Sequence, residues 1–122
     1  MIHKMEIITP ISTGELLDKI SILSIKSQYT NNQYVLKELQ DLIQIAKKHQ
    51  VYNDFYLTKL FQVNQKLWKI EDDLRVLEKE QRFDQEFIEL ARSVYKTNDL
   101  RAQIKKEINE ETQSTYQEIK LY

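Results

Sequence analysis

Glycine and proline are almost absent from this chain, and their scarcity limits the folds that it can adopt. Gly14 and Pro10 are the only two among 122 residues, whereas these types together make up roughly 12% of an average protein. Sandwiches, barrels and propellers need many tight turns, which depend on both types. P-loop and Rossmann phosphate sites need several glycines close together. We therefore expect an all-α fold without such a nucleotide site.

The length of 122 residues predicts one globular domain, 1–122, because most domains have about 50 to 200 residues. Acidic and basic residues nearly balance, with 19 and 18 respectively and a net charge of −1. The two signs are interspersed, so we expect no nucleic-acid partner. The chain has no cysteine, which excludes disulfides, thiol nucleophiles and cysteine-based metal sites. A reducing cytoplasm is the compartment that this favours.

Membrane and metal signals are also missing from the sequence. Ile20–Ile25 is the longest uncharged apolar stretch in a helix-like segment, far short of the roughly 18 residues that a membrane span requires. Met1–Pro10 lacks the apolar region and cleavage site of a signal peptide. His3 and His49 are the only histidines, and neither belongs to a zinc-binding spacing. We expect no membrane association and no cofactor.

The first helix is predicted from Ser12-x-x-Glu15, which matches a capping box directly before an apolar run. It should begin there and end near Tyr29, after an extended segment, 1–11, whose residues 5–10 look β-like. Its apolar residues fall on two sides of a helical wheel, so the helix should be sandwiched between partners.

Two further helices follow turn signals along the chain. Residues 30–32 form a polar turn, and a second helical pattern then runs to His49. From Phe55 onward, apolar residues alternate spacings of three and four, which is typical of a heptad-like seam. The third helix should end near Arg82. The residues of this seam are Leu60, Val63, Leu67, Ile70, Leu74 and Leu77.

A fourth helix is predicted from a possible cap at Asp84 through Ile108. The short polar residues 97–99 could break it, and we favour continuation. Residues 112–122 form a tail. The four principal helices should pack as an antiparallel bundle with a long third and fourth helical hairpin. Because the seam of the third helix exceeds the usual helix length of about 12 residues, we expect a homodimer.

Polar residues beside the seam suggest either a structural polar layer or a ligand cleft between the third and fourth helices. A buried Asn64 facing Asn98 would fix helix register. Alternatively, cations of the fourth helix would hold an anion such as a sugar phosphate. The candidate ligand-binding residues are Lys19, Trp68, Arg92, Asn98, Arg101 and Lys105.

The two interpretations predict different contacts. In a ligand site, Arg92, Arg101 and Lys105 must all reach the same anion. Arg92 can do so only by reaching around the helix or across to another subunit. In a scaffold, each arginine pairs with an internal carboxylate. We also expect Glu15 and Lys19 to lie beside Arg92 or Arg101.

Trp68 is expected to be mostly buried against the fourth helix, near Ala91 or Ala102, with its indole N–H bonded to a polar neighbour.

An alternative is a metal site built from carboxylates. Helical enzymes can hold Mg²⁺ with acidic residues spaced by one turn on two helices. Glu15 and Asp18 have that spacing, and Glu71 and Asp72 form a second acidic cluster. This alternative predicts that at least three of these carboxylates converge within one coordination sphere.

Three segments resemble a known family: residues 12–26 (STGELLDKISILSIK), 63–75 (VNQKLWKIEDDLR) and 83–109 (FDQEFIELARSVYKTNDLRAQIKKEIN). Together they are similar to an uncharacterised bacterial family of helical proteins, catalogued as a domain of unknown function, family 6165. The resemblance implies a small helical protein encoded near glycosyltransferase and surface-polysaccharide genes, and it implies no activity. Candidate residues within these motifs are Glu15, Asp18, Lys19, Asn64, Trp68, Glu71, Asp72, Arg75, Arg92, Tyr95, Asn98, Asp99, Arg101 and Lys105.

Two function classes follow from these observations. The first is a non-catalytic interaction or small-anion-binding module, accessory to cell-surface glycan biosynthesis, with a protein of glycan assembly or a small anion as partner. The second is a metal-dependent all-α enzyme that acts on a phosphorylated small molecule through the four carboxylates. Whether the chain catalyses a reaction stays open at this point.

Overall fold

The computed structural model describes residues 5–122, and the described residues form four helices without a strand. The prediction of an all-α chain with four principal helices is confirmed. Within residues 5–122, no helix combines the length and the apolar character needed to cross a bilayer. The helices are α1 (Thr13–Ser27), α2 (Gln33–Lys48), α3 (Asp54–Lys79) and α4 (Gln85–Glu111).

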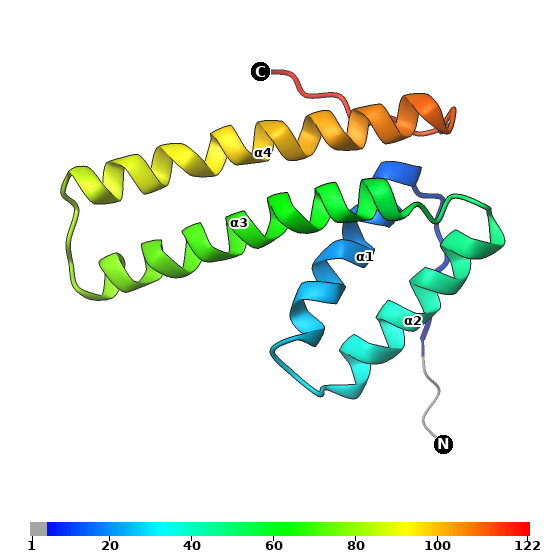
Figure 1. Cartoon of the computed structure of the whole chain (residues 1–122), viewed down its shortest axis with the longest axis horizontal. Helices are drawn as coiled ribbons and strands as arrows, with labels where there is room; N and C mark the ends of the chain where they lie inside the picture. The colour runs from blue at the N-terminus through cyan, green and yellow to red at the C-terminus, as the bar shows by residue number, and fades with distance from the viewer. Residues whose placement is uncertain (1–4) are drawn as a thin grey trace.

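Figure 1 shows α3 and α4 as a long antiparallel hairpin, with α1 and α2 packed against one half of it. The turn that joins α3 to α4 projects well beyond α1 and α2. Helix α1 contacts all three other helices, and α3 also packs along α4. The buried residues of α4 lie accordingly between Thr97 and Asn109, on the half of the hairpin that α1 covers.

The helix starts follow the polar residues that precede them. Ser12 Oγ accepts a hydrogen bond from Glu15 N at 3.1 Å, as the capping pattern predicts. Asn32, Asn53 and Asp84 cap the other three helices. Glu15 departs from the capping-box prediction, because its carboxylate accepts from Lys105.

The helix ends differ slightly from the predicted boundaries. Helix α1 ends two residues before Tyr29, and α3 ends three residues before Arg82, close to Gln81 with its φ of 55°. Helix α4 runs unbroken through residues 97–99, and Thr97 is buried. Residues 5–12 form neither helix nor strand; the rest of the predicted extended segment lies outside the described residues.

The core confirms that α1 is sandwiched between partners. Its apolar residues pack on both sides, and burying a Leu or Ile side chain stabilises a fold by about 1.5–3 kcal/mol. Ile25, on the opposite side of the helix from Leu16, is also buried. The central cluster consists of Leu16, Leu17, Ile20, Ala46, Tyr56, Leu60 and Ile108.

The heptad-like seam of α3 is covered within the chain. Leu60, Val63, Leu67, Ile70 and Leu77 are all buried, and α4 is 27 residues long. A partner helix of that length can match the 26 residues of α3. The seam therefore gives no support to the homodimer that we inferred from its length.

Gly14 allows the start of α1 to approach α4 very closely. Its backbone N–H donates to Asn109 Oδ1 at 2.7 Å. A Cβ atom at this position would lie 2.7 Å from the carbonyl oxygen of Lys105 and 2.9 Å from Asn109 Oδ1. Both distances are below normal contact, so the single glycine of the chain stands where a side chain does not fit.

Replacing Gly14 with Ala should therefore destabilise the fold by about 1–3 kcal/mol through overpacking. The free energy of unfolding, measured by urea denaturation, checks this expectation. Gln44→Ala, on the exposed surface of α2, is the control and should change stability by less than about 0.5 kcal/mol. A Gly14→Ala protein as stable as wild type would contradict the close approach of α1 to α4.

Tyr56 links the beginning of α3 to the end of α4. Its ring is buried, and its hydroxyl donates a short hydrogen bond to Glu111 Oε2. This bond, together with burial, raises the pKa of Tyr56 to about 12. An unfolded chain loses the same proton near pH 10. The stabilisation is therefore fully present below pH 10 and is lost as the pH rises toward 12.

The variant Tyr56→Phe should consequently be less stable than wild type at about pH 9, and the difference should disappear by about pH 12. Urea unfolding of both proteins across this range measures the difference directly. Because lysines titrate in both proteins, their contribution cancels. A stability gap that stays constant with pH would contradict the hydrogen bond to Glu111.

Candidate functional site

The polar side of α1 meets α4 at a buried ion pair. The side chain of Asp18 is 0% exposed, and that of Arg101 is 27% exposed. Arg101 Nε donates to Asp18 Oδ1 at 3.0 Å, and its Nη2 donates to Oδ2. Two parallel bonds between a guanidinium and a carboxylate form a strong, orientation-specific pair.

Helix α3 completes this polar layer through Asn64. Its side-chain amide donates to Asp18 Oδ1 at 2.9 Å and to Ser21 Oγ at 2.7 Å. Ser21 Oγ in turn donates to the carbonyl oxygen of Asp18 at 2.8 Å. Every member of the layer is therefore hydrogen-bonded, as buried polar groups require.

The predicted polar layer thus exists, with different partners from those expected. Asn64 is buried, but it faces α1, whereas Asn98 is exposed. Arg101 pairs with an internal carboxylate, which is the scaffold outcome. Its hydrogen bond to Asp18 raises the pKa of Arg101 in spite of the opposing desolvation.

Lys105, one turn beyond Arg101, joins α4 to the start of α1 and to the tail. Its side chain is only 7% exposed, and Nζ donates to Glu15 Oε2 at 2.8 Å. Glu118, in the tail, lies 3.3 Å from the same ammonium. The neighbouring Lys120 and then the charge of Lys105 lower the pKa of the Glu118 carboxyl.

The tail is held against the start of α1. Ser114 Oγ accepts from the backbone N–H of Thr13 at 3.2 Å, and Lys120 Nζ donates to Glu118 Oε1 at 3.0 Å. Figure 1 shows the tail running back along α4. Sequence reasoning left this segment as a weakly patterned tail, because an extended segment gives no periodic signal.

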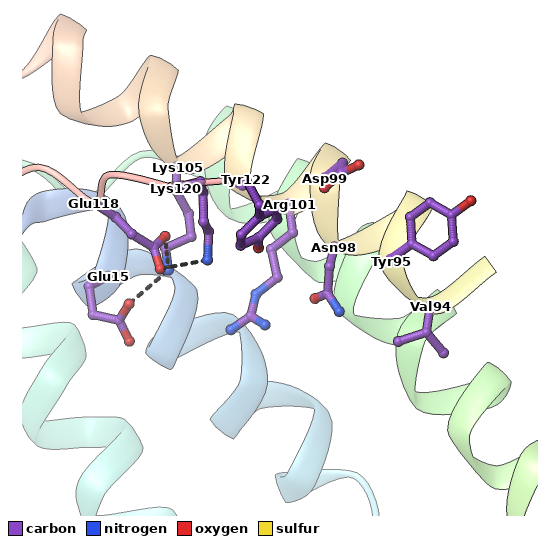
Figure 2. Close-up of a pocket in the computed structure, with 11 residues that line it drawn as sticks. Glu15, Val94, Tyr95, Asn98, Asp99, Arg101, Lys105, Glu118, Lys120 and Tyr122 are labelled. Carbon is purple, nitrogen blue, oxygen red and sulfur yellow. Dashed lines mark hydrogen bonds and ion pairs between the residues drawn. The ribbon is translucent and has the colours of Figure 1, made fainter. Parts of the chain in front are cut away.

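An open cleft of about 920 Å³ lies along α4 between the tail and the start of α1. Figure 2 shows Lys105 between the carboxylates of Glu15 and Glu118, with Arg101, Asn98 and Tyr95 farther along the helix. Three cationic and three acidic side chains line the cleft, so their formal charges cancel. The lining residues are Glu15, Val94, Tyr95, Asn98, Asp99, Arg101, Ala102, Lys105, Glu118, Lys120 and Tyr122.

The cleft contains half of the predicted ligand-binding residues. Asn98, Arg101 and Lys105 line it, whereas Lys19 and Arg92 are exposed and do not. Glu15 shares the cleft with Arg101, as expected, but Lys19 does not join them. Tyr95 and Asp99, candidates from the family motifs, also line it. The tail residues Glu118, Lys120 and Tyr122 were missed, because no sequence pattern distinguishes them from a solvated surface.

Trp68 has a different environment from the one predicted. It is partly buried, and its ring stacks on Tyr29 with centroids 5.2 Å apart and an angle of 8° between planes. Tyr29 follows the end of α1, so Trp68 helps to hold that end of the helix. The prediction placed Trp68 against α4 near Ala91 or Ala102; instead its ring packs on Tyr29, and its indole N–H has no hydrogen-bond partner within residues 5–122.

The four carboxylates of the metal alternative do not converge. Asp18 is paired with Arg101, and Glu15 with Lys105. Glu71 and Asp72 are exposed on α3, 3.8 and 3.7 Å from the guanidinium of Arg75. Among residues 5–122, no group of three or more histidine, aspartate or glutamate side chains is arranged to hold a metal ion. The geometry therefore lacks the coordination sphere that this alternative requires.

Comparison with known proteins identifies a family for the chain. The model of a family of unknown function (DUF6165) matches residues 5–122. The chain belongs to this family. The DUF6165 match includes all four helices, the ion pair of Asp18 with Arg101 and the cleft. No curated protein and no solved structure matches this DUF6165 chain significantly.

Replacing Arg101 with Met should cost about 3 kcal/mol, because it leaves the fully buried Asp18 carboxylate without its charge partner. Chemical denaturation at neutral pH checks the loss. Arg75→Met is the matched control: Arg75 forms only exposed ion pairs, so its replacement should change stability by less than about 1 kcal/mol. Equal effects of the two substitutions would contradict the structural role of Arg101.

Proposed function

We propose that this chain is a non-catalytic helical module that binds a small anionic ligand, such as a sugar phosphate, in the cleft along α4. The observation that carries the proposal is the contact between Glu118 and Lys105. A carboxylate from the tail already lies against a cation that is otherwise buried in the bundle. A ligand phosphate presents the same kind of oxygen atom to that ammonium.

The tail carboxylate is a weak competitor for Lys105. Glu118 lies 3.3 Å from Lys105 Nζ, against 2.8 Å for Glu15. Its side chain is 42% exposed, and exposed ion pairs contribute only about 0–1 kcal/mol. A phosphate can therefore replace Glu118 at small cost, whereas Glu15 remains to hold the ammonium in position.

The remainder of the cleft suits the sugar part of such a ligand. Tyr95 presents an aromatic ring, and Asn98 and Asp99 present an amide and a carboxylate. These groups can pack against a sugar ring and bond to its hydroxyls. The volume of about 920 Å³ lies within the 300–1,000 Å³ that is usual for small-molecule sites.

The proposed cellular role is accessory to cell-surface glycan assembly, on the cytoplasmic side. It is supported by the family resemblance drawn from residues 12–26, 63–75 and 83–109, and by the chemistry of the cleft. A second copy of the chain is the protein partner that we propose. The proposal contains no catalytic step, since the described carboxylates are paired with cations or dispersed.

Removal of the competing carboxylate tests the proposal. Glucose 1-phosphate, titrated into the protein in a calorimeter at low salt, should bind, and Glu118→Gln should bind it about two- to fivefold more tightly. Added salt should weaken both affinities because the attraction is ionic and partly exposed. Glu110→Gln, an exposed α4 glutamate outside the cleft, should bind like wild type.

Two results would overturn this function. One is the absence of heat and of any thermal stabilisation for wild type and Glu118→Gln at millimolar glucose 1-phosphate. The other is an affinity that Glu118→Gln and Glu110→Gln change equally. Because Glu118 and Glu110 are both exposed, neither substitution should disturb the core.

A further inference from the structure

Helix α4 carries a second, uncovered stripe toward the end that joins α3. Ile88, Ala91, Tyr95 and Asn98 follow one another at spacings of three and four, so they line one face of the helix. All four are exposed, Ile88 at 47% and Tyr95 at 53%. The stripe lies on nearly the opposite side of α4 from the buried Thr97, as 100° per residue requires.

The same stripe continues into the covered part of the helix. Ala102, Lys105 and Asn109 extend the alternation of spacings. Ala102 is partly buried, and Lys105 and Asn109 are buried, with Gly14 of α1 against them. The projecting half of the hairpin repeats this pattern beyond the reach of α1 (Figure 1). A seam that is packed at one end of a helix is thus left open at the other.

Two charged residues border the open stripe on one edge. Arg92 and Asp99 are seven residues apart, which is about two helical turns, so their side chains project in the same direction. Neither takes part in an ion pair within residues 5–122. Along this edge the cation, Arg92, lies nearer the start of α4 and the anion, Asp99, lies two turns later.

This charge order is complementary to itself under a two-fold rotation. When two copies of α4 lie antiparallel with the axis near residues 95–96, Arg92 of each copy faces Asp99 of the other. Tyr95 then lies near Asn98 of the second copy, and Ala91 leaves room for close approach. We propose that two copies of this chain dimerise through the stripe of Ile88, Ala91, Tyr95 and Asn98, with two symmetric ion pairs. Such isologous contacts are the commonest form of oligomer interface.

The second copy also contributes to the cleft. Tyr95, Asn98 and Asp99 line that end of the cleft, so in the dimer the second copy closes this end and brings its Arg92 to Asp99. A sugar phosphate on Lys105 then lies between the tail and the second copy. The formal charge of the lining then changes from balanced to positive. The dimer does not depend on the anion binding proposed above, but this role of Arg92 does. On one helix Arg92 and Arg101 are two and a half turns apart and cannot reach the same ligand. Arg92 of the second copy can lie near the cleft that Arg101 lines.

Charge reversal tests the pairing without disturbing the core, because Arg92 and Asp99 are both exposed. Wild type should sediment as a dimer at micromolar to submillimolar concentration. Arg92→Asp alone and Asp99→Arg alone each place like charges at both contacts and should raise the dimer dissociation constant at least about tenfold. An equimolar mixture of the two variants restores opposite charges at both contacts and should form a heterodimer with near-wild-type affinity.

Dimer formation and anion binding can be tested separately. Lys66→Glu, exposed on α3 and away from the stripe, should dimerise like wild type. A monomeric wild type over this range overturns the proposal, as does a mixture that associates no better than the separate variants. Titration of glucose 1-phosphate into the monomeric Arg92→Asp protein shows separately whether Lys105 binds an anion without the second copy.

Discussion

The buried carboxylate of Asp18 is the constraint on which the arrangement of the helices depends. Removing a charge from water costs several kcal/mol, and only donors at fixed positions offset that cost. Arg101 and Asn64 supply those donors from α4 and α3. Because α1 is apolar on two sides, hydrophobic contacts alone would tolerate more than one rotation of the helix. We infer that Asp18 selects one rotation, since only that one directs its carboxylate between α3 and α4.

This constraint separates the structural cation of α4 from the cation that serves the cleft. Arg101 lines the cleft, but its guanidinium is already bonded twice to Asp18. Lys105 divides its contacts between Glu15 of the bundle and Glu118 of the tail. Two cations one turn apart therefore have different freedom to accept a new partner. Arg101 faces the buried carboxylate of Asp18, whereas Lys105 also faces Glu118 in the exposed tail.

The elements with strong local signals could be predicted from the sequence. The seam from Leu60 to Leu77 is buried except at Leu74, which is partly buried, and Ser12 and Asp84 cap their helices as expected. The partners across the fold could not be predicted in the same way. Asp18 was a candidate ligand only in the metal alternative, because an acidic residue in a sequence is compatible with water, a metal ion or an arginine. The fold, not the residue type, determines which of these an acidic side chain meets, and the extended tail gave no periodic signal at all.

The polar contacts that complete the bundle connect the beginning of the chain to its far end. Asp18 and Arg101 are separated by 83 residues, Glu15 and Lys105 by 90, and Gly14 and Asn109 by 95. During synthesis, α1 leaves the ribosome long before any of its partners on α4 exists. Contacts of such sequence separation slow folding, since the intervening chain must be ordered first. The acidic side chain of α1 therefore stays in water until α4 has been translated.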